Sequence, residues 1–256
     1  MKDQVQIFLT AVMFFTRIPV PKWIDHSEEY LNKASMYFPL VGWIVGGFAA
    51  VLFWAGSLVL PAYIAIIISM IGSVMMTGAF HEDAFADFCD GFGGGWTQQK
   101  ILDIMKDSRV GTFAVAGLIF MLGLKFALLL KLSEAGMWVT CVSLITAHSF
   151  SRFASTSIIY SHQYVKENED SKAKPLAKKM DISLLIIAGI FGIAPFALFD
   201  SYLYLAAIIP VFAARMYFAR YIKKWIGGYT GDCLGAIQQI GEVIFYLSII
   251  IIWKYI

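Results

Sequence analysis

Long, almost uncharged apolar runs constrain this chain more than any other feature. A helix that crosses a bilayer needs about 20 mostly apolar residues, and seven stretches of the sequence qualify. Hydrophobic residues make up 59% of the 256 residues and charged residues 15%, against about 45–50% and about 25% in soluble proteins. So much apolar side chain cannot be buried in a water-soluble fold and must face lipid. The runs are 36–60, 62–80, 112–130, 136–160, 182–199, 202–218 and 236–256.

These runs predict an all-α fold, a polytopic transmembrane helical bundle, because backbone inside a bilayer must satisfy its own hydrogen bonds. We expect one integral-membrane domain over residues 1–256 and about seven spans. Residues 4–20 are a marginal eighth candidate, because two glutamines and Arg17 make a surface-lying or half-inserted helix as plausible as a crossing. No small-residue cleavage site follows this run, so we expect it to be retained and not removed as a signal peptide.

Basic segments predict the orientation of the bundle. Segment 215–224 carries four basic residues, and segment 161–181 carries the lysines named below. Two crossings join these segments, so they share a side, and the positive-inside rule makes that side cytoplasmic. Counting back places 81–111 and 21–35 on the same side. We therefore expect a multi-pass protein of the cell (inner) membrane with a cytoplasmic active face. The lysines are Lys166, Lys172, Lys174, Lys178 and Lys179.

Charge and cysteine content exclude other classes of partner and site. The formal net charge of +2 is too small to indicate a nucleic-acid partner. The cysteines are far apart and include no CxxC pair, so neither a zinc site nor a disulfide framework is predicted. The composition requires contact with membrane lipid. Nothing in the sequence indicates an oligomeric state.

An acidic segment lies between two apolar runs, at 81–111. On a helix, at about 100° per residue, Asp83, Asp87 and Asp90 would fall within an arc of about 60°. Three carboxylates on one face repel each other unless a divalent cation lies among them, and oxygen ligands without His or Cys suit Mg²⁺ or Mn²⁺. The spacing favours a metal site formed by these aspartates. A solvated acidic loop is the alternative.

The residues that follow favour phosphate binding. Gly93, Gly94 and Gly95 are expected to end the helix and expose backbone amides to phosphate oxygens. A second short helix, at about 97–108, would carry further acids beside basic residues. Carboxylates for a metal next to cations are typical of phosphoryl transfer. For the glycine run alone, a flexible joint is an equally simple interpretation.

Charged residues inside the apolar runs need partners. Lys125, His148 and Arg152 are expected to face the bundle interior, because charges facing lipid are costly. For Lys125 and Arg152, the alternative roles are snorkelling to the interface or a purely structural ion pair. For His148, the alternative is a hydrogen-bonded packing role. Asp232 is expected to cap the last helix. Capping does not explain Glu242, which is a further candidate ligand or hydrogen-bond acceptor. A secondary transporter would also carry such intramembrane charges.

Motifs along nearly the whole chain resemble those of the cobalamin (cobamide) synthase family, the adenosylcobinamide-GDP ribazoletransferases. The two most specific are the aspartate motif and the Lys-Asp-Ser-Arg motif, in this order. The family pattern usually has Leu where Glu82 stands, so that extra acid is another candidate ligand. The motifs are FFTRIPVPKW at 14–23, YFPLVGWIVGG at 37–47, HEDAFADFCDG at 81–91, IMKDSRVGT at 104–112, AHSFSR at 147–152 and GGYTGDCLGA at 227–236.

The resemblance implies a Mg²⁺-dependent transferase with a corrinoid nucleotide and an α-ribazole-type riboside as substrates. The riboside 3′-hydroxyl would attack the phosphorus nearest cobinamide in adenosylcobinamide-GDP, and GMP would leave. Adenosylcobalamin, or its 5′-phosphate, would form. A CDP-alcohol phosphotransferase is a related alternative, because DxxDG at 87–91 echoes its opening motif, although the Ala-Arg element that should follow is missing.

The resemblance also implies roles for individual residues. The catalytic candidates are Asp83, Asp87, Asp90 and Asp107, of which the first three would hold Mg²⁺ and one of the four would accept the hydroxyl proton. The phosphate-binding candidates are Lys106, Arg109, Arg152, Gly93, Gly94 and Gly95. The second-tier candidates are Asp232, Glu242, Lys125, His148 and Glu82.

Overall fold

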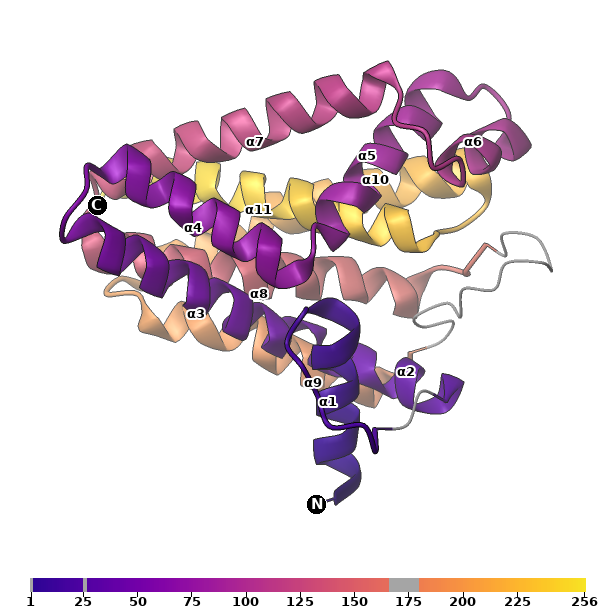
Figure 1. Cartoon of the computed structure of the whole chain (residues 1–256), viewed down its shortest axis with the longest axis horizontal. Helices are drawn as coiled ribbons and strands as arrows, with labels where there is room; N and C mark the ends of the chain where they lie inside the picture. Colours follow the sequence, from indigo (N-terminus) through magenta and orange to yellow (C-terminus); the bar gives the residue numbers. More distant parts are fainter. Residues whose placement is uncertain (1, 25–26, 166–179) are drawn as a thin grey trace.

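The computed structural model describes residues 2–24, 27–165 and 180–256, and these residues form a helical bundle without β-strands (Figure 1). An isolated bridge between Tyr164 and Tyr229 is the one described β-type contact. The prediction of an all-α bundle is confirmed. The lysines expected to orient the segment after residue 165, namely Lys166, Lys172, Lys174, Lys178 and Lys179, lie outside the described residues.

Each predicted apolar run contains a helix. Short α-helices and 3-10 helices connect or extend the long ones in the described chain. The elements are α1 (Lys2–Phe15), α2 (Glu28–Ala34), η1 (Ser35–Tyr37), α3 (Phe38–Ser57), α4 (Ala62–Thr77), α5 (Phe80–Gly94), α6 (Gln98–Met105), α7 (Thr112–Ser133), α8 (Met137–Ser161), α9 (Ile182–Ile193), η2 (Ala194–Leu198), η3 (Tyr202–Ala207), α10 (Ile208–Ile226) and α11 (Gly231–Trp253).

Fewer helices than expected are long and apolar enough to cross a membrane. Four stretches of the described chain pass by length and composition, or five if α4 and α5 form one bent span. These helices account for four or five of the about seven predicted spans, and further apolar helices lie in the other runs. Residues 182–199 give only a short apolar helix, and α1 is also short. The four stretches are Glu29–Ser57, Thr112–Ser133, Tyr202–Ile226 and Gly231–Trp253.

Helix α8 shows why one predicted run is not among these spans. It packs against α3, α9 and α11 and is buried over most of its length, although it is rich in serine and threonine. Because its neighbours are protein and not lipid, its side chains need not be apolar. Glycines of α3 allow the close approach, since a Cβ on Gly42 would lie 2.3 Å from the backbone oxygen of His148.

Helices α4 and α5 meet at a sharp bend. Their axes differ by 87°, and Gly78 and Ala79 between them have φ values of +67° and +60°, in the left-handed region. Arg17 lies against the bend. Its backbone N–H donates to the carbonyl of Met76 at 2.7 Å, and a Cβ on Gly78 would lie 2.2 Å from Arg17 Nε.

The bend sets the direction in which the acidic segment enters the bundle. The sequence placed residues 81–111 after a completed span, on one face of the membrane. In the structure, α5 leaves α4 at an angle of 87° and packs against α11 and α7, and His81 near its start is only 1% exposed. The aspartates therefore project from a helix that belongs to the bundle.

Candidate active site

One cavity collects the four aspartates predicted to be catalytic. It has a volume of about 200 Å³ and lies between α5, the end of α6 and the start of α7. The aspartates of α5 reach it together because the helix is regular from Phe80 to Gly94, which keeps their i, i+4, i+7 spacing on one face. Their catalytic roles remain predictions. The lining residues are Asp83, Ala86, Asp87, Asp90, Met105, Lys106, Asp107, Ser108, Val110 and Ala114.

Asp90 is held by the first turn of α7. The N–H of Gly111 donates to Asp90 Oδ2 at 2.6 Å, and the N–H of Ala114 donates to Oδ1 at 2.9 Å. Gly111 occupies the N-cap position of α7 and has no side chain that could accept these bonds. The carboxylate of Asp90 thus caps α7 from a neighbouring helix, at the positive end of its dipole.

Asp107 is paired with Arg109. Helix α6 ends at Met105 and does not continue to 108 as expected, so both residues lie in the loop beyond it. Arg109 Nε donates to both oxygens of Asp107 at 3.0 Å, and Nη2 lies 2.5 Å from Oδ2. These hydrogen bonds lower the pKa of Asp107 to about 2. A carboxylate of such low pKa is a weak proton acceptor near neutral pH.

The glycine run packs helices and does not present amides. Gly93 and Gly94 lie inside α5, where N–H groups bond within the helix, and the N–H of Gly95 donates to the carbonyl of Gly91 at 2.9 Å. The expectation that these amides are free for phosphate is therefore wrong. A Cβ on Gly93 would lie 2.6 Å from the ring of Phe113, so the glycine is needed for close packing.

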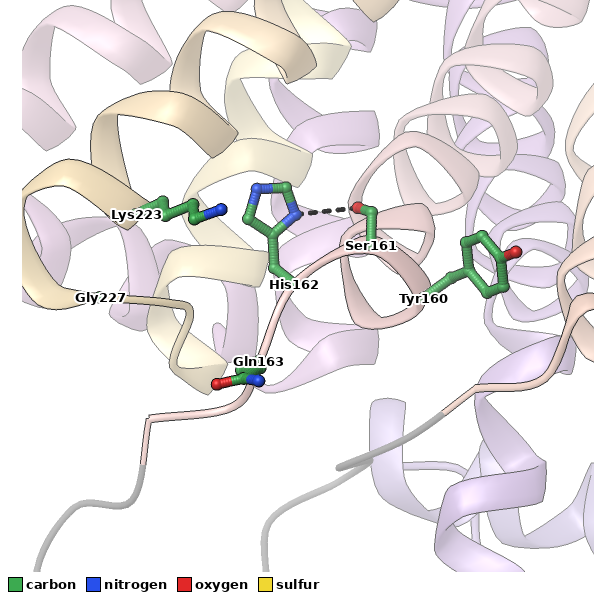
Figure 2. A pocket seen from close by; sticks show the side chains of 6 residues that line it. All are labelled: Tyr160, Ser161, His162, Gln163, Lys223 and Gly227. Atoms are coloured by element: carbon green, nitrogen blue, oxygen red, sulfur yellow. Dashed lines mark hydrogen bonds between the residues drawn. The ribbon is translucent and has the colours of Figure 1, made fainter.

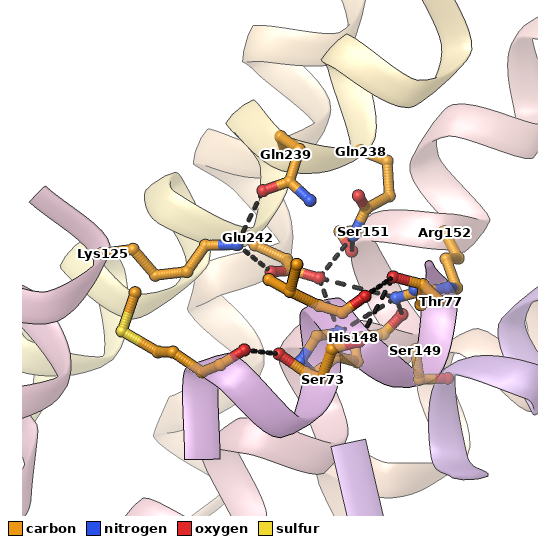
Figure 3. A network of polar contacts seen from close by, with 12 residues as sticks. Ser73, Thr77, Lys125, His148, Ser149, Ser151, Arg152, Gln238, Gln239 and Glu242 are labelled. Carbon is orange, nitrogen blue, oxygen red and sulfur yellow. Dashed lines mark hydrogen bonds and ion pairs between the residues drawn. The ribbon is translucent and has the colours of Figure 1, made fainter. Parts of the chain in front are cut away.

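A buried ionic network surrounds Glu242 in α11 (Figure 3). Its Oε2 lies 2.7 Å from Lys125 Nζ. Its Oε1 lies 2.7 Å from His148 Nδ1 and 3.5 Å from Arg152 Nη1. The side chain of Glu242 is fully buried and that of Arg152 is 1% exposed. Both cations are thus paired inside the bundle and do not snorkel, and Arg152 is absent from the described lining of the aspartate cavity.

Gln239 connects this network to the aspartate helix. Its Oε1 accepts from Lys125 Nζ at 2.6 Å, and its Nε2 donates to Glu82 Oε1 at 3.0 Å. Glu82 is the residue immediately before Asp83, which lines the cavity. Gln239 was not among the predicted site residues. The available signal was an amide three residues from Glu242 on the same apolar helix, a spacing that places the two side chains side by side.

The start of α11 differs from expectation by two residues. Thr230 is the N-cap, and its Oγ1 accepts from the N–H of Cys233 at 3.3 Å. Asp232 instead lies in the first turn, where its charge suits the positive end of the helix dipole. It is not among the described residues that line the aspartate cavity.

The donor chemistry of the cavity suits a magnesium ion shared with a substrate. Among the residues that the structure describes, no three His, Cys, Asp or Glu side chains form a group that could hold a metal ion. Mg²⁺, however, is usually bound by one or two carboxylates together with substrate phosphates and water. Asp83 and Asp87 offer such a pair, from successive turns of α5.

Comparisons with known proteins place the chain in one family. The sequence model of cobalamin-5-phosphate synthase matches residues 7–250. An adenosylcobinamide-GDP ribazoletransferase of Shewanella frigidimarina (strain NCIMB 400) is 44% identical, over 96% of this chain and 95% of the relative. Its namesake in Shewanella amazonensis is 43% identical, over 99% and 98%. No solved structure matches.

Proposed function

The chain belongs to the cobalamin-5-phosphate synthase family, and on this premise we propose that it acts as an adenosylcobinamide-GDP ribazoletransferase. It joins adenosylcobinamide-GDP to α-ribazole, or to its 5′-phosphate, and releases GMP. The supporting observation is that four aspartates and Lys106 from two specific motifs line one cavity. Relatives that match nearly the whole chain favour this activity over transport or CDP-alcohol chemistry.

The transfer is a displacement at phosphorus. The 3′-hydroxyl oxygen of the riboside forms a bond to the phosphorus nearest cobinamide, the bond from that phosphorus to the bridging oxygen breaks, and the electron pair leaves with GMP. A carboxylate of the cavity takes the hydroxyl proton. Asp83 and Asp87 are the candidates, because Arg109 makes Asp107 a weak base and α7 engages both oxygens of Asp90.

Charge neutralisation is the second task of the site, since phosphoryl transfer depends mainly on positioning and electrostatics. Lys106 lines the cavity and can bind phosphate oxygens as a point charge. Asp83 and Asp87 would hold Mg²⁺, which when bound withdraws charge from the diphosphate and the departing GMP. Arg109, whose side chain is 88% exposed, pairs with Asp107 and is not among the described lining residues.

The aspartate cavity faces the cytoplasm from the cell (inner) membrane in this proposal. Helices α6 and α10 meet at one end of the bundle, because Gln98 Nε2 at the start of α6 donates to the carbonyl of Ile226 at the end of α10, at 2.9 Å. Basic residues gather at this end. Lys106, Lys223 and Lys224 belong to this end. The positive-inside rule assigns it to the cytoplasm.

Product analysis of the purified, lipid-embedded protein tests the activity. Adenosylcobinamide-GDP is supplied with α-ribazole or α-ribazole 5′-phosphate, with and without Mg²⁺, and CDP-diacylglycerol is supplied in a parallel reaction. We expect GMP and the joined corrinoid in equal amounts. Release of CMP without GMP, or uptake of the corrinoid without cleavage of the diphosphate, contradicts the proposal.

A further inference from the structure

A second and larger cavity lies where α8 and α10 end (Figure 2). Its volume is about 400 Å³, and it shares no described lining residue with the aspartate cavity. No acidic residue is among those described around it, and Figure 2 shows the ammonium end of Lys223 pointing toward the ring of His162. The lining residues are Tyr160, Ser161, His162, Gln163, Lys223 and Gly227.

The loop after α10 fixes one wall of this cavity. Gly227 has a φ of +83°, which favours glycine, and a Cβ on Gly228 would lie 2.1 Å from the backbone oxygen of Gln163. The N–H of Tyr229 donates to that same oxygen at 3.0 Å, and the N–H of Val165 donates back to Tyr229 at 2.9 Å. Gly227 therefore lines this wall, and Gly228 allows the close contact with Gln163, roles that the transfer reaction does not explain.

Two cations lie at this cavity: Lys223 lines it, and Arg215 contacts the lining residue Ser161. Arg215 Nε donates to Ser157 Oγ at 2.9 Å, and its Nη2 donates to Ser157 O at 2.8 Å and to Ser161 Oγ. Ser161 Oγ lies 2.9 Å from His162 Nδ1. Burial, with the charges of Arg215 and Lys223, lowers the pKa of His162. The imidazole is thus mainly neutral at pH 7, and the cationic charge comes from the lysine and the arginine.

The cavity lies at the end of a candidate span, where lipid headgroups are expected. Helix α10 ends a candidate span, Tyr202–Ile226, so Lys223 lies at its boundary with water. Tyr217, Tyr221 and Trp225 follow one another along the last turns of α10, with ring centroids 6.3–6.4 Å apart, as expected of an aromatic belt. Basic pockets at such boundaries bind the phosphates of anionic lipids.

We infer that this cavity binds a phosphate group, with Lys223 as the counter-charge and the Gln163 amide as a neighbouring hydrogen-bond donor. That phosphate has two possible sources. One is the headgroup of an anionic phospholipid. The other is a nucleotide-type substrate, since α6 leads in eight residues, or about 12 Å, from this end of α10 to Lys106 of the aspartate cavity.

Binding to the full chain in detergent tests the inference with a matched pair of variants. Lys223→Ala removes the lining lysine, whereas Lys224→Ala removes its exposed neighbour, which does not line the cavity. Native mass spectrometry measures retention of phosphatidylglycerol against phosphatidylcholine. Equilibrium dialysis measures α-ribazole 5′-phosphate against α-ribazole. Size-exclusion chromatography verifies that each variant is folded, and Lys223→Arg restores the charge.

We expect Lys223→Ala to reduce about tenfold either the preference for phosphatidylglycerol over phosphatidylcholine or that for α-ribazole 5′-phosphate over α-ribazole. This is the effect of losing one charge-assisted hydrogen bond. Lys224→Ala should leave both preferences unchanged. A change confined to phosphatidylglycerol identifies a lipid site, and one confined to the phosphorylated riboside identifies a substrate site. Equal preferences in both variants for every ligand overturn the inference. Because no measurement requires turnover, the result is independent of the proposed transferase activity.

Discussion

Asp90 and Gly111 connect the aspartate helix to the start of α7 through a hydrogen bond of 2.6 Å from the Gly111 N–H to Asp90 Oδ2. The spacing of acids in the sequence assigned Asp90 to a metal. The structure shows both of its oxygens bound to the backbone of another helix. Asp90 therefore determines where α5 stands relative to α7, while Asp83 and Asp87 line the cavity beside it.

Asp90→Asn should lower stability more than Asp83→Asn. The amide keeps one accepting oxygen but presents an NH₂ group to the other N–H donor, so we expect a loss of about 1–2 kcal/mol in the free energy of unfolding. Asp83 is exposed in the cavity mouth, and we expect its variant to unfold near the wild-type temperature. Thermal unfolding in detergent measures both. Equal midpoints for the two variants would show that the cap of α7 is dispensable.

Glu242→Gln should be among the most destabilising single substitutions. It leaves Lys125 and Arg152 buried without their carboxylate, and breaking a buried ion pair in this way costs about 3–5 kcal/mol. Glu134→Gln is the matched control, because Glu134 pairs with Lys131 at the surface and exposed pairs contribute below about 1 kcal/mol. Chemical unfolding compares the two variants. Similar losses would contradict a structural role for the Glu242 network.

Gly78→Ala and Gly47→Ala should change stability in opposite directions. Ala at residue 78 has a left-handed φ and a Cβ that collides with Arg17, so we expect a loss of at least about 1 kcal/mol. Gly47 lies inside α3 with no atom within 4 Å of an added Cβ, and alanine there should gain about 0.5–1 kcal/mol. Melting temperatures of the two variants test this. A stabilised Gly78→Ala protein would mean that the bend does not depend on glycine.

The acid limb of the pH–rate profile should not depend on Asp107. Its pKa of about 2 lies below the ordinary value of 3.8, so any contribution of its ion pair is complete above about pH 4 and is lost only as the pH falls through 2. We expect Asp107→Asn to lower kcat/KM without moving the midpoint of the acid limb. The pH dependence of GMP release measures this midpoint. A midpoint that shifts in Asp107→Asn would identify Asp107 as the base.

Local sequence patterns predicted the helices and the shared face of the aspartates, because helical period and apolar length are encoded in neighbouring residues. The ion pair between Lys125 and Glu242 could not be predicted in this way, since it joins residues 117 positions apart. The bend before α5 also escaped prediction. Ala79 adopts a positive φ there, a conformation that alanine rarely takes and that depends on packing around it.

Packing also explains two features of individual segments. The serine-rich helix α8 is not lipid-facing because α3, α9 and α11 cover it. From the sequence alone, the glycines at 93–95 could be interpreted as a phosphate-binding loop or as a flexible joint. The position of Phe113 beside Gly93 shows that Gly93 serves close packing. Both outcomes depend on contacts between distant segments, which one sequence does not reveal.

The Mg²⁺ dependence of GMP release in Asp87→Asn, compared with Asp103→Asn, is the most direct test of the aspartate site. Asp103 lies on α6 outside the cavity and accepts a hydrogen bond from Gln99 at 2.8 Å, so its variant controls for the loss of one acid. We predict that Asp87→Asn abolishes Mg²⁺-dependent release in lipid-embedded protein and that Asp103→Asn retains it. Wild-type turnover by Asp87→Asn at every Mg²⁺ concentration would contradict the proposed site.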